Sequence, residues 1–262
     1  MSIDPLAEEY FQYSPYNYVA NNPISMIDPD GRKFVNFDEE GNFVGVEKDN
    51  FWHNLWHGTK GRVRNEEGKT LRRFRFADPK HDVEDLENGT ITRVHFVDNE
   101  TIYNMLFEAG AFDEANRDKP GDFLLREGIG GGDFDFSYTA IPSLYIEGVS
   151  SDPKTRPSSV LFLVEGMAHN HMNFGNFLYG AGGATLGVHK GALLAGAHKN
   201  SRFPSTGDGK RIPHGEANNN GYTPQWDSKD DQRSISVGYY HARRLSYHQM
   251  SIIAGKPRII WE

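Results

Sequence analysis

The sequence predicts an α+β fold with a β-hairpin-rich N-terminal part and a mainly helical C-terminal part. Two observations predict it. Short β-rich runs around Gly-containing turns dominate residues 33–97, and helix-compatible apolar spacing with N-cap residues is found in several segments beyond them. The 262 residues, 37% of them hydrophobic and 13% aromatic, are enough for one large or two small domains with a core.

The expected strands fall into two groups. The segments KFVNF-DEEGN-FVGV and RVRN-EEGK-TLRRFRF each place two β-rich runs around a turn, and TRVHFV is a further alternating run. Residues 159–164 form the most apolar run of the chain, which predicts a buried strand. We expect this strand to deliver His169 and His171 to an exposed loop.

Two helices are predicted from their capping residues. Asp98 precedes an apolar spacing that ends near Gly110, as in an N-capped helix. Ser228 is expected to cap a helix that runs from Lys229 to about Met250. Its apolar side is expected to carry Ile235, Val237, Tyr240 and Leu245.

Small residues give residues 176–199 a helix-compatible spacing. Gly183, Gly187 and Gly191 are four apart, so on one helix they share a face against which another element can pack closely. We therefore expect a buried, tightly crossed helix pair. Residues 201–225 consist of turn formers and predict a long loop.

The net charge of −8 is unevenly distributed. Residues 154–262 carry 13 Lys and Arg against 7 Asp and Glu, whereas residues 1–153 carry 15 against 29. The basic part also holds most of the His, which suits an anionic substrate, although uneven surface charge within one domain is the plainer interpretation. The absence of Cys excludes disulfides, a thiol nucleophile and a Cys-ligated zinc site.

The N-terminal residues have neither a basic nor an apolar signal-peptide region, so we expect no Sec signal. The longest weakly polar run, residues 174–197, is interrupted by His189 and Lys190. Its uncharged pieces are shorter than the roughly 20 residues of a spanning helix. We therefore expect no membrane span.

The candidate catalytic residues are polar side chains clustered in the C-terminal part. A His with an ordinary pKa near neutrality acts as a general base, and a nearby carboxylate strengthens it. The expected catalytic set comprises His171, Asn176, Tyr179, His198, Asp231 and Gln232. No residue is assigned to a cofactor, and the metal is left unknown: a divalent ion is compatible with the residues but not favoured, since no metal-ligand motif is present.

Residues 4–32 carry a stretch of the form Pro-x4-Asp-Pro-x-Gly, formed by Pro23, Asp28, Pro29 and Gly31. This stretch resembles the end of the Rhs/YD-repeat core, which in that family precedes a variable C-terminal toxin. The resemblance implies the tail of a polymorphic toxin. Its implied partners are a cognate immunity protein and a secretion apparatus or Rhs cage.

The C-terminal part carries a second resemblance: it is similar to the polymorphic toxin type 44 family. The segment NFLYGA and the later segment DQRSISVG match patterns of that family. The matching residues are Asn176, Phe177, Tyr179, Gly180, Ala181, Asp231, Gln232, Ile235 and Gly238.

These observations predict three regions. Residues 1–32 are a remnant of the Rhs core end, 33–153 an acidic α+β region and 154–262 a toxin-like domain, the last two folding separately or as one unit. The resemblance implies a bacterial effector of interbacterial competition, secreted or injected without a Sec signal, whose site of action in the target cell is unknown.

The expected activity is hydrolysis. An anionic polymer is the first substrate class, so a nuclease acting on RNA or DNA is preferred because of the basic C-terminal part. Peptidoglycan hydrolysis, with Asp231 or Glu165 as the acid, is an alternative. A second alternative is a non-enzymatic tail, which either disrupts membranes or is purely structural.

Overall fold

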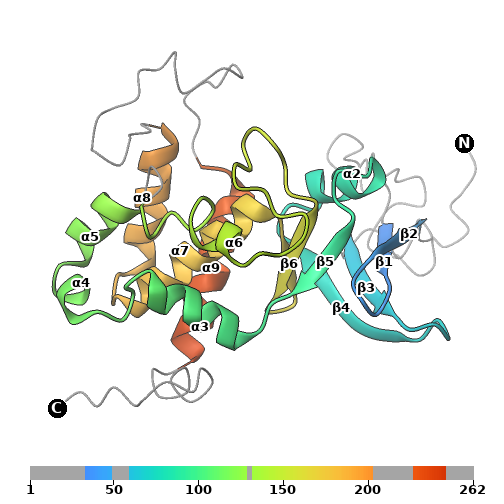
Figure 1. The fold of residues 1–262 in the computed structure, drawn as a ribbon, viewed down its shortest axis with the longest axis horizontal. Helices are drawn as coiled ribbons and strands as arrows, with labels where there is room; N and C mark the ends of the chain where they lie inside the picture. The colour runs from blue at the N-terminus through green and yellow to red at the C-terminus, as the bar shows by residue number, and fades with distance from the viewer. Residues whose placement is uncertain (1–32, 49–58, 129–131, 203–226, 246–262) are drawn as a thin grey trace, which may run out of the picture.

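The computed structural model describes residues 33–48, 59–128, 132–202 and 227–245 (Figure 1). The described chain combines helices with one mixed seven-stranded sheet, and its strands lie mainly in the N-terminal half. The predicted α+β class is therefore confirmed. The expected core-end remnant at 1–32 and nearly all of the expected loop 201–225 lie outside the described residues.

The sheet has the strand order β2-β1-β3-β4-β7-β6-β5. Pairs β1–β2, β3–β4 and β6–β7 are antiparallel, whereas β1–β3, β4–β7 and β5–β6 are parallel. Strands from both sides of the expected boundary at 153 and 154 thus share one sheet. The strands are β1 (Lys33–Phe37), β2 (Phe43–Lys48), β3 (Lys60–Arg64), β4 (Thr70–Phe76), β5 (Arg93–Phe96), β6 (Val160–Val164) and β7 (Met167–His169).

All five residues of β6 are buried, as its apolar sequence predicts. Successive side chains of a strand point to opposite faces of the sheet. Leu161 and Leu163 accordingly belong to one hydrophobic core, while Phe162 and Val164 belong to the other. A strand covered on both faces needs no polar residues, which explains the unbroken run.

The first core lies on the face of the sheet to which Leu161 and Leu163 point. The turn after β1 approaches β5, because the Val94 amide donates to the Gly41 carbonyl at 2.7 Å and Asn42 bridges Arg93. Gly41 has a φ of +88°, and a Cβ there would overlap the Val94 carbonyl oxygen. Helix α2 (His81–Glu87), which the sequence patterns did not predict, adds Val83 and Leu86 to this core.

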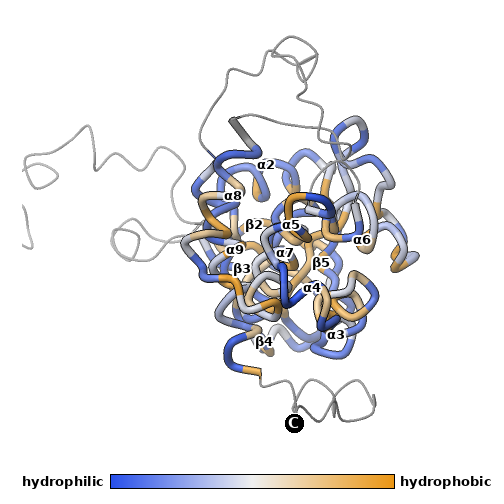
Figure 2. The backbone as a smooth tube through the Cα atoms, turned by 90° about the vertical axis from the view of Figure 1, so that its left-hand side faces the viewer, coloured by the Kyte–Doolittle hydropathy of each residue, from blue (hydrophilic) through white to orange (hydrophobic). Residues whose placement is uncertain are grey.

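The second core lies between β6 and the remaining helices. Figure 2 shows the chain by hydropathy, with hydrophilic stretches along α2 at the margin of the view. Helix α7 (His171–Thr185) is hydrophobic on nearly all sides and is the most buried of the helices described. The remaining helices are α3 (Asn99–Glu108), α4 (Glu114–Asp118), α5 (Pro120–Glu127), α6 (Ala140–Ser143), α8 (Lys190–Arg202) and α9 (Lys229–Arg244).

Both predicted N-caps are confirmed. Asp98 Oδ1 accepts from the Thr101 amide at 2.7 Å, and Ser228 Oγ accepts from the Asp231 amide at 3.3 Å. The predicted end of the last helix is wrong, since α9 ends at Arg244 and its C-cap Leu245 has an extended backbone. Tyr240, expected on its apolar side, is 53% exposed.

The prediction of one helix over 176–199 is also wrong. Helix α7 ends at Thr185, and Gly187 has a φ of +84°, which an α-helix cannot accommodate. The expected tightly crossed helix pair exists, but it is the α7–α9 pair. A Cβ on Gly180 would overlap the Ile235 carbonyl oxygen, and one on Gly238 would overlap that of Phe177.

Candidate active site

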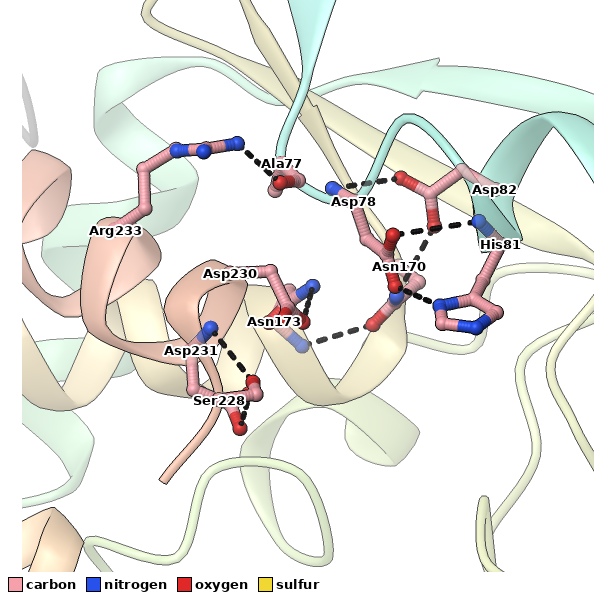
Figure 3. Close-up of polar contacts among 10 residues, drawn as sticks. All are labelled: Ala77, Asp78, His81, Asp82, Asn170, Asn173, Ser228, Asp230, Asp231 and Arg233. Carbon is pink, nitrogen blue, oxygen red and sulfur yellow. Dashed lines mark hydrogen bonds and ion pairs between the residues drawn. The ribbon is translucent and has the colours of Figure 1, made fainter. Parts of the chain in front are cut away.

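Helices α2, α7 and α9 begin close together, near the ends of strands β4 and β7. Figure 3 shows polar side chains from α2, α7 and α9 directed toward one another. The first turn of a helix has unpaired backbone N–H groups and a partial positive charge, so it attracts the oxygen atoms of polar side chains. Asn170 and Ser228 cap α7 and α9 through such oxygens.

Asparagines three residues apart connect α7 to the other two helices. The residue Asn170 lies at the N-cap, and Asn173 and Asn176 follow it along one side of α7. Each Nδ2 donates to a different aspartate, and we call this set the asparagine ladder. The bonds join Asn170 to Asp82 (3.0 Å), Asn173 to Asp230 (3.1 Å) and Asn176 to Asp231 (2.6 Å).

Burial changes the protonation of two ladder aspartates. Asp82 is 1% exposed, and burial raises its pKa to about 8 despite the hydrogen bond from Asn170. Burial likewise raises the pKa of Asp231 to about 7, with the charges of Asp227 and Asp230 adding to the effect. The ladder thus contains carboxyl groups that hold protons near neutral pH.

His81 and Asp78 form a pair at the solvent-facing side of the ladder. The Nδ1 atom of His81 lies 2.5 Å from Oδ2 of Asp78, and the His81 side chain is 65% exposed. The hydrogen bond and the charge of Asp78 raise the pKa of His81, and Asp230 contributes in the same direction. In Figure 3 the second ring nitrogen points away from the cluster.

Two cations lie on or contact the segment that carries this pair. Arg233 is exposed, and its Nη1 donates at 2.6 Å to the carbonyl of Ala77, the residue before Asp78. Lys80 is exposed and close enough to lower the pKa of His81 electrostatically. A base that is oriented by a carboxylate and has a cation beside it can activate a hydroxyl group near an anion.

Four of the six residues expected from the sequence lie on α7 and α9. Asn176 and Asp231 bond to each other. Gln232 donates to Asp227, and burial together with the charge of Asp227 raises the pKa of Tyr179 to about 12. The direct contact within the expected set is therefore the one between Asn176 and Asp231.

The two expected histidines lie elsewhere. His171 is 4% exposed, with Nδ1 2.6 Å from Ser158 Oγ and Nε2 2.7 Å from the Ser137 carbonyl oxygen. Because both ring nitrogens are bonded inside the fold, His171 has no atom to offer a substrate. His198 is half-buried on α8 and makes none of the ladder contacts.

The exposed loop expected at His169 and His171 does not exist. Strand β7 ends at His169, and α7 begins at His171 after the single cap residue Asn170. His169 is fully buried, bonds Ser234 Oγ at 3.0 Å, and has its pKa lowered to about 3 by burial. Because β7 leads directly into the buried helix α7, His169 and His171 are both buried in the core.

Sequence reasoning missed the residues at the start of α2 and just before it. Asp78, His81 and Asp82 lie in a short acidic segment that gives little helix signal on its own. The three-residue spacing of the asparagines is visible in the sequence, and it could have identified the ladder face of α7.

Within the described ranges, no group of three or more His, Asp or Glu is arranged to hold a metal ion. The helices of that same part of the chain include none that is long and apolar enough to cross a membrane. Comparisons with protein-family models, with curated proteins and with solved structures found no match.

Proposed function

We propose that this chain carries the effector part of an Rhs-type polymorphic toxin and that it is a hydrolase with His81 as general base. The observation that carries the proposal is the 2.5 Å contact between His81 Nδ1 and Asp78, with the ring exposed. The resemblances at 4–32 and at NFLYGA and DQRSISVG support the toxin assignment. On this proposal the site combines residues from both sides of position 153.

In the proposed reaction, His81 removes a proton from an attacking hydroxyl or water through Nε2. Asp78 accepts from Nδ1–H, which fixes the tautomer and stabilises the imidazolium that forms. A carboxyl group that holds a proton near neutral pH is suited to protonating the leaving group, and Asp231 is partly exposed and has such a pKa. Asp82 is too buried for this role and supports the site through Asn170.

RNA is the substrate class that we favour. Its 2′-hydroxyl is an internal nucleophile that needs one base and one acid. Lys80 lies next to His81, and Arg233 bonds to the residue before Asp78, so both cations suit a phosphodiester. The basic C-terminal region suits a polyanion.

A glycosidic bond is the second candidate, because its hydrolysis needs a protonated carboxylic acid. Asp231 meets this requirement. Glu165 does not: although burial raises its pKa, hydrogen bonds and charges from His241 and Arg244 bring the pKa below its ordinary value. Asp231 is therefore the acid to test for a cell-wall substrate.

The test is growth of a bacterial host that expresses the full chain in the cytoplasm or, separately, behind a periplasmic signal. His81→Asn is compared with His189→Asn, a matched change at an exposed histidine before α8. Cytoplasmic toxicity that only His81→Asn removes, together with cleavage of labelled RNA by purified protein, supports the nuclease. Toxicity confined to the periplasm supports the glycan substrate, and no toxicity in either compartment contradicts the effector proposal.

A further inference from the structure

Two hairpin turns of the sheet have the same sequence pattern and the same geometry. Residues 38–42 read DEEGN and residues 65–69 read NEEGK. In each turn the first side chain accepts from the backbone amide four residues later, at 2.7 Å for Asp38 and 2.8 Å for Asn65. Gly41 and Gly68 both have positive φ. The chain therefore presents the pair Glu-Glu twice in the same conformation.

The parallel pairing of β1 with β3 brings these turns to one end of the sheet. Phe37 lies opposite Val63 in the register, so both strands run into their turns side by side. Figure 1 places these strands at the end of the molecule away from α4 and α5. The two turns and β2 surround a hollow of about 650 Å³, which we call the acidic hollow.

Carboxylates dominate the lining of the acidic hollow. Among the described residues of its lining, the one cation is Arg64, whose Nη1 donates to Glu47 Oε1 at 2.8 Å. Glu47 also accepts from Arg62 at 2.6 Å, so its charge is offset within the protein. The glutamates at the turns are exposed to solvent. The acidic residues of the lining are Asp38, Glu39, Glu40, Glu47, Glu66 and Glu67.

A buried acceptor lies in the same lining. Asn36 is 5% exposed, and its Oδ1 has no hydrogen-bond partner among the described residues. Its neighbour on β2 is Gly45, and the position of a Cβ on Gly45 is open space. A buried carbonyl oxygen without a donor is costly, so an N–H group supplied by a ligand would remove this cost.

We propose that the acidic hollow binds an arginine- or lysine-bearing segment of a partner protein. A guanidinium can donate to several carboxylates at once and also to an amide oxygen such as Asn36 Oδ1. The volume exceeds that of one side chain and suits a short segment. The described acidic side chains do not converge as a metal site does, which favours the organic cation. The proposal does not depend on the proposed hydrolase activity.

The test measures binding of a fluorescein-labelled hexa-arginine peptide to the full chain by fluorescence anisotropy at physiological salt. The double variant Glu39→Gln, Glu66→Gln is expected to bind about tenfold more weakly. The matched control is Glu108→Gln, Glu147→Gln, which removes two exposed carboxylates outside the hollow and is expected to bind as the unchanged protein does.

Three results would overturn the proposal. The first is equal weakening in both double variants, because the peptide would then respond only to the overall charge. The second is the absence of binding to the unchanged protein. The third is specific displacement of the peptide by calcium chloride, which would indicate a metal site. The proposal expects calcium to leave peptide binding unaltered beyond the effect of its ionic strength.

Discussion

Asn176 Nδ2 donates a 2.6 Å hydrogen bond to Asp231 Oδ1, which joins the second turn of α7 to the first turn of α9. We predict that Asn176→Leu lowers the free energy of unfolding by about 1–3 kcal/mol, because the largely buried Asp231 carboxyl loses a donor. Urea denaturation followed by circular dichroism measures the change. Asn200→Leu, at an exposed asparagine on α8, is the control and is expected to change stability by less than about 0.5 kcal/mol.

The raised pKa of Asp82 makes stability depend on pH. Folding raises this pKa from 3.8 to about 8, so the folded protein binds a proton that the unfolded chain has released. The stabilising contribution is complete below pH 3.8 and is lost as the pH rises through about 8. We predict that Asp82→Asn reduces the fall in stability between pH 5 and 8 by up to about 1 kcal/mol per pH unit.

Urea midpoints at several pH values in that window measure this effect. Asp85→Asn, on the same helix, is the comparison and is expected to keep the pH dependence of the unchanged protein. Identical pH profiles for the Asp82→Asn variant and the unchanged protein would contradict the assignment. Asp231 has a pKa raised in the same sense, so part of the pH dependence is expected to remain in the Asp82 variant.

The His81–Asp78 pair predicts a pH profile for hydrolysis. A general base works when deprotonated, so activity rises with pH through the His81 pKa. Asp78 raises that pKa. The variant Asp78→Asn is therefore expected to move the acid limb of kcat/KM to lower pH while reducing the maximum rate. His81→Asn is expected to lower the rate by a factor of about 10²–10⁴. An acid limb unmoved by Asp78→Asn would show that another group acts as the base.

Local sequence signals predicted the strands and caps well, because each depends on a few neighbouring residues. The Glu-Glu-Gly turns and the apolar run of β6 are examples. The break between α7 and α8 was missed because Gly187 is compatible with a helix in sequence and adopts a positive φ only in the fold. Helix α2 has seven residues and no side-chain N-cap, so its signal is weak.

The residues that α7 and α9 bring to the site were predictable, whereas those at the start of α2 were not. The polar residues of NFLYGA and of DQRSISVG were expected to act together, and they do meet at Asn176 and Asp231. Asn170 hydrogen-bonds to Asp82, 88 residues away in sequence, because β7 pairs with β4, the strand that precedes α2. That pairing is a property of the sheet order, which the spacing of residues does not encode.

The contact between α7 and α9 is expected to be the feature of the fold least tolerant of added volume. A Cβ on Gly238 would overlap the Phe177 carbonyl oxygen, and backbone cannot move aside as a flexible side chain does. We predict that Gly238→Ala destabilises the protein by about 2–3 kcal/mol, although alanine is the better helix former. Thermal unfolding by calorimetry measures the change.

Gly121→Ala is the matched control for this prediction. Gly121 lies on α5, and its Cβ would meet open space. The same substitution is therefore expected to stabilise the protein by about 0.5–1 kcal/mol through helix propensity alone. Because the added methyl group meets backbone at Gly238 and open space at Gly121, opposite signs for the two variants measure the close approach of the helices. Two stabilising results would mean that α7 and α9 can separate at little cost, and the ladder bonds from Asn173 and Asn176 would then not be held by this packing.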